Sequence, residues 1–542
     1  MPTPTSRDRA PSRLAGVLNS LKVAAGVALL GVLLVACGSD SDPDPNVVST
    51  DKGNVKGSVS GSVQSFLGIP FAAPPTGALR WKAPAPAAAW TGDRDATAFA
   101  THCPQIDTAF GRATNSAEDC LHLNVYRPTS GSQLPVMVYI HGGALFLGES
   151  EDYDPSALVG QGVVVVTVNY RLGALGFLAH PALSAEGAGA SGNYGFMDQQ
   201  AALQWVQTNI GKFGGDQSNV TIFGESAGGT SVHTHLASPL SRGLFHKAIV
   251  QSGSYTLKTP SLAAAEAKGN VFATAAGCVA QTAACLRALS PAQVLANQGA
   301  IIGGNGIVGN VDNKVLTQAL GTAFATGAFN RVPVIEGTNA NEYSLLSAFA
   351  FDFSAPVTAQ TYAASAALVI GFYDATKTLA EVDAAYPVAS FASPIIAIDR
   401  IGTDSAYSCP ARAIVKMLSA YTPTFQYEFA DPNPPMIYLP STSSHPAGSW
   451  GAYHASEIQY VLKVTPSIPT PPAFTAAQQV LSTQMIGFWT QFAKTGSPNT
   501  AGSTLWPQYS AGMDTALLLD PAGVRTTTDF AARHRCQFWS GS

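Results

Sequence analysis

A serine between glycines is the first candidate for chemistry in this chain. The segment Gly-Glu-Ser-Ala-Gly at residues 224–228 matches the G-x-S-x-G pattern, in which the serine hydroxyl is a nucleophile. It follows a short apolar and β-branched run, residues 219–223, and it precedes small residues that favour the start of a helix. A sharp turn from strand to helix exposes a serine Oγ at a sheet edge, beside the positive end of the helix dipole. We therefore predict that Ser226 is a nucleophile.

Attack by a serine on an ester carbonyl creates negative charge on oxygen, so the site needs hydrogen-bond donors at that position. The sequence His-Gly-Gly-Ala at residues 141–144 directly follows the apolar run 134–140. Two consecutive glycines allow the backbone to approach a substrate closely. We predict an oxyanion hole formed by the backbone N–H groups of Gly142, Gly143 and Ala227.

A serine nucleophile also needs a base and an acid, which follow it in the order Ser, Asp or Glu, His. Of the ten histidines, three come late enough in the chain: His445, His454 and His534. The first precedes a proline and the last lies beside a cysteine, so we predict His454 as the base. For the acid, Glu336 at the end of the predicted strand 332–335 and Glu342 in the following loop both fit, and spacing does not separate them.

The rest of the chain must position these groups, and its pattern is that of an α/β protein. Apolar β-rich runs alternate with Ala-rich helical stretches as far as Trp539. The runs 134–140 and 163–168 are almost continuously apolar, as in strands buried on both faces. Residues 198–210 have the pattern of a helix packed on a sheet. We expect a large, mostly parallel central sheet flanked by helices, in a single catalytic domain over residues 46–542.

Composition excludes some functions. Charged residues make up 12% of the 542 residues and the formal net charge is −5, which is not the footprint of a nucleic-acid-binding protein. The sequence has no spacing typical of metal ligands, and the predicted chemistry needs neither a metal nor an organic cofactor.

The first 45 residues have the layout of an export signal. Four basic residues precede the uncharged apolar run 23–36, which is shorter than a bilayer-spanning helix, and Leu-Val-Ala-Cys at residues 34–37 resembles a bacterial lipobox. We predict that residues 1–36 are a lipoprotein signal peptide, that Cys37 is lipidated, and that residues 37–45 form a flexible tether. The protein would then be exported and anchored to a bacterial membrane, periplasmic or at the cell surface, and could be shed from it.

Cysteine usage agrees with export. Seven cysteines less Cys37 leave six, an even number that suits three disulfides in an oxidising compartment. Two pairs are close in sequence, which leaves a third pair to close a long loop: Cys103 with Cys120, Cys278 with Cys285, and Cys409 with Cys536.

Together, these and other segments resemble the type-B carboxylesterases, the family that includes cholinesterases and fungal lipases. The most specific is EDCLHLNVY at residues 118–126, in which His122 replaces the family's usual tyrosine. Further matching segments run along most of the chain: GIPFA (68–72), NYRL (169–172), GNYG (192–195), FGGD (213–216), QSG (251–253) and GTNANE (337–342).

The resemblance implies an α/β-hydrolase fold with insertions that form a lid or gorge. It implies a carboxylic-ester hydrolase with a Ser-His-Glu triad and an acyl-enzyme intermediate, and it favours Glu342 over Glu336 as the acid. It implies the same three disulfides, places His454 at the family's base, and gives supporting positions to Glu225, Ser252 and Glu457. A small-molecule ester is the expected substrate.

Departures from the family limit this transfer. The segment between Cys103 and Cys120 contains no tryptophan, whereas cholinesterases carry there an aromatic platform for quaternary ammonium groups, so a cholinesterase is not expected. A lipase, or a hydrolase of carbamates or specialised esters, remains an alternative. So does an inactive neuroligin-like binding protein, although such relatives usually lose the serine. The segment from Phe349 to Phe353 either lines an apolar pocket or belongs to the core. Neither the natural substrate nor the oligomeric state follows from the sequence.

Overall fold

One large sheet organises the fold. The computed structural model describes residues 44–108, 113–302, 307–352, 356–373, 376–502 and 504–540. Within these ranges the sheet has eleven strands, in the spatial order β16 (Arg525–Thr527), β15 (Ala516–Leu519), β13 (Thr424–Phe429), β12 (Val334–Asn339), β11 (Lys247–Gln251), β10 (Gly215–Glu225), β7 (Leu134–Ile140), β9 (Val164–Val168), β6 (His122–Pro128), β4 (Val63–Pro70) and β3 (Ser58–Ser60).

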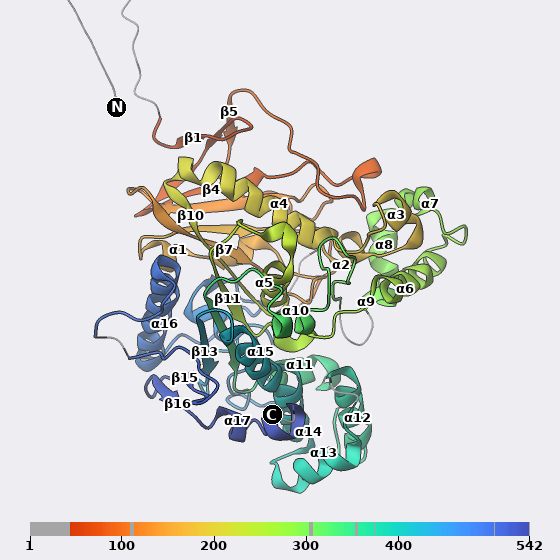
Figure 1. Ribbon diagram of the computed structural model, residues 1–542, viewed down its shortest axis with the longest axis vertical. Helices are drawn as coiled ribbons and strands as arrows, with labels where there is room; N and C mark the ends of the chain where they lie inside the picture. Colours follow the sequence, from red (N-terminus) through yellow and green to blue (C-terminus); the bar gives the residue numbers. More distant parts are fainter. Residues whose placement is uncertain are drawn as a thin grey trace, which may run out of the picture. The chain divides into compact units, whose positions relative to one another are not determined.

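Neighbouring strands from β9 through β15 pair parallel, and β3, β4, β6 and β16 add antiparallel edges. The prediction of a large, mostly parallel sheet flanked by helices is thus confirmed (Figure 1).

The two faces of the sheet bury different cores, as the unbroken apolar strands require. Along β7, Val136, Val138 and Ile140 belong to one core, and the alternate residues Met137 and Tyr139 belong to the other. The first core is covered by α4 (Tyr194–Asn209), α5 (Ala227–Ala237) and α15 (Cys409–Ser419), and the second by α1 (Ser156–Val159) and α16 (Ala476–Thr495).

The predicted elements lie where the sequence placed them, with differences at their ends. Strand β7 has the predicted bounds and β9 differs by one residue, whereas β10 extends the predicted strand 219–223 in both directions. The helix predicted over 198–210 begins earlier, at Tyr194, because Tyr194 and Phe196 continue its buried face.

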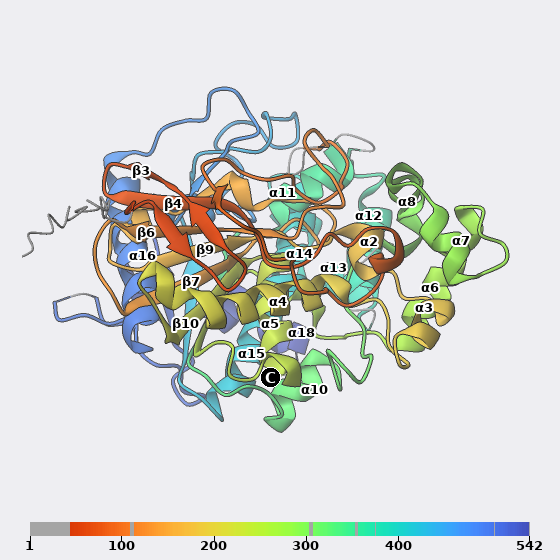
Figure 2. The ribbon, with the colours of Figure 1, turned by 90° about the horizontal axis from the view of Figure 1, so that it is seen from above.

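Helical insertions follow the strands that form the middle of the sheet. Between β11 and β12 the chain forms α6 (Leu262–Ala275), α7 (Ala283–Ala288), α8 (Pro291–Asn297), α9 (Gly299–Ile302) and α10 (Leu320–Thr326). Of these, α6, α7 and α8 gather with α3 (Pro181–Glu186) at one end of the sheet in both ribbon views (Figures 1 and 2).

Between β12 and β13 lie α11 (Tyr343–Ser347), the π-helix η6 (Ala348–Asp352), α12 (Tyr362–Tyr373), α13 (Leu379–Ala385), α14 (Pro394–Gly402) and the π-helix η8 (Thr403–Ser408), which leads into α15. These elements share a third core with α17 (Phe530–Arg533) and α18 (Cys536–Ser540).

The third core contains part of the segment from Phe349 to Phe353, for which the sequence left a pocket role and a core role open. Phe351 is buried in it, whereas Phe349 is partly buried against the second core. Phe353 lies outside the described residues. Phe351 is therefore a core residue.

The remaining elements are short: α2 (Gly173–Phe177), a three-stranded sheet of β1 (Val47–Ser49), β2 (Asn54–Lys56) and β5 (Asp93–Asp95), and the pair β8 (Tyr153–Asp154) with β14 (Lys463–Val464). The structure contains the three predicted disulfides, Cys103–Cys120, Cys278–Cys285 and Cys409–Cys536.

Residues Pro45–Ser542 form one compact unit. The predicted signal peptide, Cys37 and all of the tether but its last two residues lie outside the described residues. Within the described ranges, no helix is both long enough and apolar enough to cross a membrane.

Candidate active site

Ser226 occupies a strained turn between β10 and α5. Its backbone has φ 55° and ψ −120°, a conformation that L-residues rarely adopt. A Cβ at Gly228 would collide with the carbonyl oxygen of Ile140, so only glycine allows α5 to start this close to β7. The N–H of Ser226 donates to the carbonyl of Gln251 at 2.8 Å, which ties the turn to the end of β11. The turn thus holds a partly exposed serine at the carboxyl edge of the sheet.

The glycine turn after β7 lies directly against this serine. A Cβ at Gly142 would stand 3.3 Å from Cβ of Ser226 and 2.9 Å from Oε2 of Glu225. Gly143 follows with φ 100° and is half-buried, and Ala227 is the first residue of α5. The structure therefore places Gly142 and Ala227 beside Ser226, with Gly143 next in the glycine turn.

His141, which begins this glycine turn, is a buried support. Its ring stacks on Tyr170 with centroids 4.4 Å apart, and Nδ1 lies 2.8 Å from the carbonyl oxygen of Gly142. Burial lowers the pKa of His141 to about 4, so its ring is neutral near pH 7. It holds the turn in place and presents no charge to the site.

Glu342 and His454 form a direct pair. Nδ1 of His454 lies 2.6 Å from Oε2 of Glu342, and the other carboxylate oxygen accepts the N–H of Asn339 at 2.8 Å. Glu336 instead contacts His233, with 2.8 Å between Oε2 and Nε2. The difference has a simple origin: Glu336 lies inside β12, where the strand fixes its side chain toward α5, whereas Glu342 lies in the turn beyond the end of the strand.

The three late histidines have different surroundings. His454 Nε2 lies 3.2 Å from Oε1 of Glu225, the residue that precedes the serine. The other two have both ring nitrogens on other carboxylates: His445 on Asp352 and Asp399, and His534 on Asp404 and Glu428. Of the three, only His454 contacts a residue of the serine turn. The described residues show no hydrogen bond between His454 and Ser226 Oγ.

Three buried carboxyl groups surround His454. Besides Glu225 and Glu342, Glu457 lies in the same cluster, where it accepts hydrogen bonds from Asn339 Nδ2 at 2.6 Å and Gln251 Nε2 at 3.1 Å. Burial lowers the pKa of His454, but the charges of Glu225 and Glu342 outweigh it and raise the pKa to about 9.

The same crowding raises the pKa values of two of these acids. Burial and then the charge of Glu342 raise the pKa of Glu457 to about 7, and burial raises that of Glu225 well above its usual range. The cluster therefore favours an imidazolium and partly protonated acids.

Ser252 lies behind the serine turn, after β11. Its φ is 53°, its N–H donates to the carbonyl of Gly337 at 2.8 Å, and its side chain is fully buried. The neighbouring carbonyl of Gly253 accepts the hydroxyl of Thr230 in α5 at 3.0 Å. This segment fixes the start of α5 against β11.

Sequence reasoning missed several residues of the cluster. The amide of Asn339 also donates to the carbonyl of Tyr453 at 2.9 Å, and thereby joins the acid strand to the histidine loop. The ring of Tyr407 packs on His454 with centroids 5.1 Å apart. Asn339 and Gln251 lie in segments that resemble the family, so those segments carried a signal, whereas nothing in the sequence around Tyr407 indicated its position.

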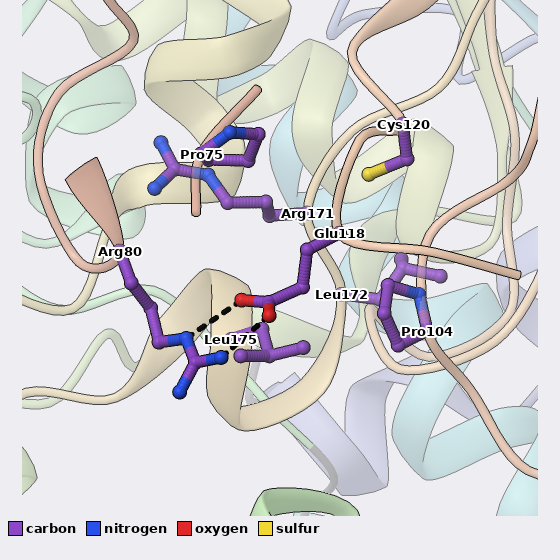
Figure 3. A pocket seen from close by; sticks show the side chains of 8 residues that line it. All are labelled: Pro75, Arg80, Pro104, Glu118, Cys120, Arg171, Leu172 and Leu175. Carbon is purple, nitrogen blue, oxygen red and sulfur yellow. Dashed lines mark hydrogen bonds and ion pairs between the residues drawn. The ribbon is translucent and has the colours of Figure 1, made fainter. Parts of the chain in front are cut away.

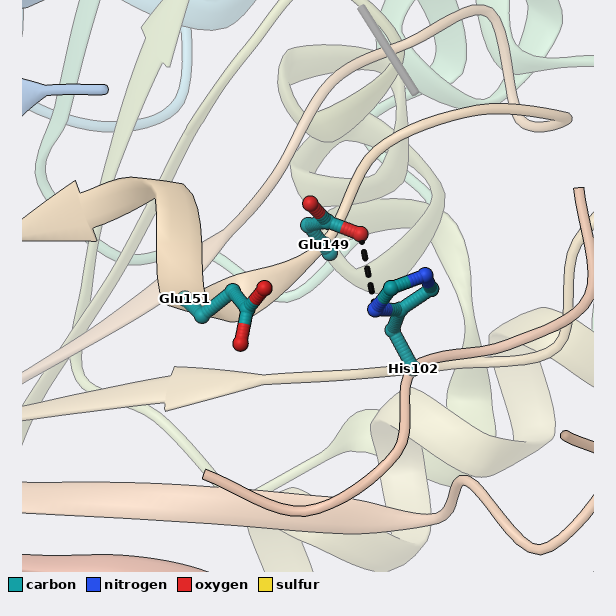
Figure 4. Close-up of side chains that lie close together, drawn as sticks. All are labelled: His102, Glu149 and Glu151. Atoms are coloured by element: carbon teal, nitrogen blue, oxygen red, sulfur yellow. Dashed lines mark ion pairs between the residues drawn. The ribbon is translucent and has the colours of Figure 1, made fainter. Parts of the chain in front are cut away.

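One cluster combines ligand types that a metal accepts. His102, Glu149 and Glu151 bring ligand atoms within 4.8 Å of one another (Figure 4). An ion pair of 2.9 Å between His102 Nδ1 and Glu149 Oε2 already accounts for the approach of two of them. The cluster therefore needs no metal to explain its geometry.

A small pocket is lined by residues that take no part in the cluster around His454. Arg80 and Glu118, joined by a bidentate ion pair, line it together with Pro75, Pro104, Cys120, Arg171, Leu172 and Leu175 (Figure 3). Glu118 belongs to the segment 118–126 that resembles the family, and here it pairs with Arg80, which also donates to the carbonyls of Arg287 and Leu289.

Comparison with known proteins agrees with this fold. The chain matches the model of the carboxylesterase family over residues 44–539, and it belongs to that family. It is 37% identical to a fumonisin B1 esterase of Sphingopyxis macrogoltabida over 89% of this chain and 88% of the relative. It is 36% identical to the para-nitrobenzyl esterase of Bacillus subtilis (88% and 94%) and 33% identical to the human cocaine esterase (94% and 93%).

The protein is accordingly a serine hydrolase of carboxylic esters, with the α/β-hydrolase fold of its family. Its three disulfides are typical of exported proteins.

Proposed function

We propose that Ser226, His454 and Glu342 are the catalytic residues of this esterase and that the reaction passes through an acyl-enzyme on Ser226. The observation that carries the proposal is the Glu342–His454 pair at 2.6 Å, with the other ring nitrogen of His454 3.2 Å from Glu225, the neighbour of Ser226. For acylation, Nε2 of His454 must turn from Glu225 toward Ser226 Oγ. Catalytic hydrogen bonds often tighten only when substrate is bound.

The first half of the reaction forms the acyl-enzyme. Neutral His454 takes the proton of Ser226 as Oγ attacks the ester carbonyl, and Glu342 stabilises the imidazolium that results. The N–H groups of Gly142, Gly143 and Ala227 donate to the oxyanion of the tetrahedral intermediate. His454 then gives its proton to the leaving alcohol.

The second half is the hydrolysis of the acyl-enzyme. His454 takes a proton from water, which attacks the acyl carbonyl, and the proton passes to Ser226 as the acid leaves. The site is supported by Glu225, Ser252 and Glu457. The two glutamates influence the charge of His454, and Ser252 helps to fix the backbone of the serine turn. We assign these three residues no contact with the reacting atoms.

Hydrolysis of p-nitrophenyl acetate, butyrate and palmitate tests this proposal. Ser226→Ala should abolish turnover, while Ser482→Ala, which truncates a buried serine bonded to the carbonyl of Tyr460 in the second core, should keep it. The profile over acyl chain length separates an esterase from a lipase, the alternative activity on the same site. Turnover that survives Ser226→Ala would refute the assignment of the nucleophile.

We further propose that residues 1–36 are removed on export, that Cys37 carries a lipid anchor, that residues 37–45 are a tether, and that residues 46–542 are the catalytic domain. Support comes from the basic and apolar pattern before Cys37 and from the three disulfides. Growth of a bacterial host with radiolabelled palmitate should label the wild-type protein and leave Cys37→Ser unlabelled. Equal labelling of both would contradict the anchor.

A further inference from the structure

A second histidine, His445, is held in the loop that leads to His454. Its side chain is fully buried, with Nδ1 2.9 Å from Asp352 Oδ2 and Nε2 3.0 Å from Asp399 Oδ2. The indole of Trp450 stacks on the imidazole, with centroids 4.7 Å apart and planes 14° from parallel. Three separate segments therefore meet at one imidazole: the π-helix η6, helix α14 and the loop after β13.

These segments carry the proposed acid and base. Helix α11 begins directly after Glu342 and continues into η6, which ends at Asp352. His445 lies in the loop between β13 and the 3-10 helix η9 (Ile458–Tyr460), and this same loop carries His454. The contact between Asp352 and His445 thus joins the end of the helical segment that follows Glu342 to the part of the loop that precedes His454.

Further hydrogen bonds continue this junction toward the active site. Ser344 Oγ in α11 donates to the carbonyl of Trp450 at 2.8 Å. The N–H of Asn341 donates to the carbonyl of Ala452 at 3.0 Å, and the N–H of Ala452 donates to Asn341 Oδ1 at 3.2 Å. The two segments are therefore bonded at intervals from His445 almost to His454, and the Glu342–His454 contact stands at the end of that series.

The contacts of His445 favour a charged ring. A neutral imidazole has one N–H and one lone pair, and a lone pair directed at a carboxylate oxygen is repelled. Both nitrogens of His445 face carboxyl groups, so an imidazolium donates to both, whereas a neutral ring keeps both contacts only if Asp399, whose pKa burial raises, carries the proton. Although burial lowers the pKa of His445, its bonds to Asp399 and Asp352 outweigh this and raise the pKa above its usual value.

The other groups near this ring are neutral. Thr442 donates to Asp352 at 2.5 Å and Ser347 donates to Asp399, from the loop and from α11. Arg400, the neighbour of Asp399 in α14, pairs instead with Asp404 and with the carbonyl of Arg533. Among the described residues that face His445, Asp352 and Asp399 are the charged ones.

We propose that His445 is a positioning residue for the esterase reaction: as an imidazolium it clamps the segment of Glu342 to the loop of His454, and loss of its proton loosens that alignment. The proposal rests on the proposed roles of Glu342 and His454. The proposal adds His445 as a second titrating histidine beside His454, and His445 contacts no reacting atom.

The test measures kcat and KM against pH for the full-length, disulfide-bonded protein and its variants. His445→Gln should lower kcat at least about 10-fold with KM changed less than about 3-fold, because alignment of the triad acts on the chemical step. His180→Gln is the matched control: it replaces another buried histidine, bonded to Gln281 at 2.8 Å, and should leave kcat within about 2-fold.

Asp352→Asn should shift the pH dependence of kcat, which a purely structural role of His445 would not do. The amide oxygen can still accept from Nδ1, so the clamp should hold at pH 6.5, but loss of one carboxylate lowers the pKa of His445. The alkaline fall in kcat should therefore begin at least about one pH unit lower than in the wild type. If His445→Gln does not fold, Asp352→Asn alone tests the proposal.

Tryptophan fluorescence reports the protonation of His445 independently of activity. The difference between wild type and Trp450→Phe should change with pH at the midpoint of the alkaline fall in kcat, and Asp352→Asn should move both together. Wild-type kcat in His445→Gln, or an unshifted alkaline limb in Asp352→Asn, would overturn the clamp while leaving the triad intact. Absence of Ser226-dependent turnover in the wild type would overturn the proposed function itself.

Discussion

His454 and Glu342 stand 112 residues apart in the chain, yet their Nδ1 and Oε2 atoms lie 2.6 Å apart and both side chains are buried. The approach depends on two loops beyond the ends of neighbouring parallel strands, β12 and β13. Asn339 bridges them through its side-chain amide, which donates to the carbonyl of Tyr453 and to Glu457. The end of β12 thus contributes to holding the loop of His454 beside Glu342.

The identity of the acid can be tested by comparing two glutamates. Glu342→Gln should lower kcat about 10³- to 10⁴-fold, because the amide no longer stabilises the imidazolium or fixes its tautomer. Glu336→Gln removes the carboxylate from His233, so it should lower the unfolding midpoint while kcat stays within about 3-fold. Equal losses of kcat in the two variants would contradict the assignment.

The oxyanion turn is predicted to be intolerant of any side chain at Gly142. In Gly142→Ala the new methyl group would stand 2.9 Å from the carboxylate of Glu225 and 3.3 Å from Cβ of Ser226, which displaces the turn. We expect kcat to fall roughly 100- to 1000-fold, the usual effect of losing one oxyanion donor. Affinity for a trifluoromethyl ketone that adds to the serine should fall in parallel, and an unchanged affinity would refute the role.

The pH profile should reflect the base. A general base acts only when neutral, so with a pKa of His454 raised to about 9, kcat/KM should fall as the pH drops below about 9. Glu225→Gln removes the largest charge that raises this pKa, so the acid limb should move to lower pH by roughly one unit. A limb that stays in place, or moves to higher pH, would show that Glu225 does not set the charge of His454.

Stability should also depend on pH through the buried histidine His534. His534 lies between Asp404 and Glu428, and although burial lowers its pKa, these carboxylates raise it above the usual 6.5. A raised pKa in the folded state stabilises the protein below the unfolded pKa, and this contribution is lost as the pH rises through the folded one. The free energy of unfolding in urea should therefore decline from about pH 6.5 upward.

His534→Gln is the control for that decline. It should lower the free energy of unfolding near neutral pH and flatten its dependence on pH above about 6.5. His445 contributes a similar decline, so the slope should diminish rather than vanish. A slope identical to that of the wild type would exclude the titration of His534 as a cause.

The candidate residues that the sequence located most directly lie next to short motifs that determine the local backbone conformation. The strand before residue 224, the glycines around Ser226 and the double glycine after β7 each predict a local backbone, and local backbone is what such patterns encode. The buried strands were recognisable because both of their faces are apolar, as the alternation of Val136 and Met137 between two cores illustrates.

What the residues alone left open depended on contacts between distant segments. Spacing did not separate Glu336 from Glu342, since the strand continues to Asn339 and its end decides which side chain is free to turn toward the histidine loop. Tyr407 and His445 gave no local signal, because their positions follow from the packing of the helices inserted between β12 and β13. The family resemblance favoured Glu342, which is the glutamate that contacts His454 in the structure.

The central claim, an acyl-enzyme on Ser226, is tested most directly by locating a covalent adduct. Disulfide-bonded wild-type protein is treated with a fluorophosphonate or quenched in acid during turnover of p-nitrophenyl butyrate, then digested and analysed by mass spectrometry. We predict that the phosphonyl or butyryl group is found on the peptide that contains Ser226, and that Glu342→Gln acquires it more slowly. An adduct on another residue, or none in a protein that hydrolyses the ester, would contradict the account.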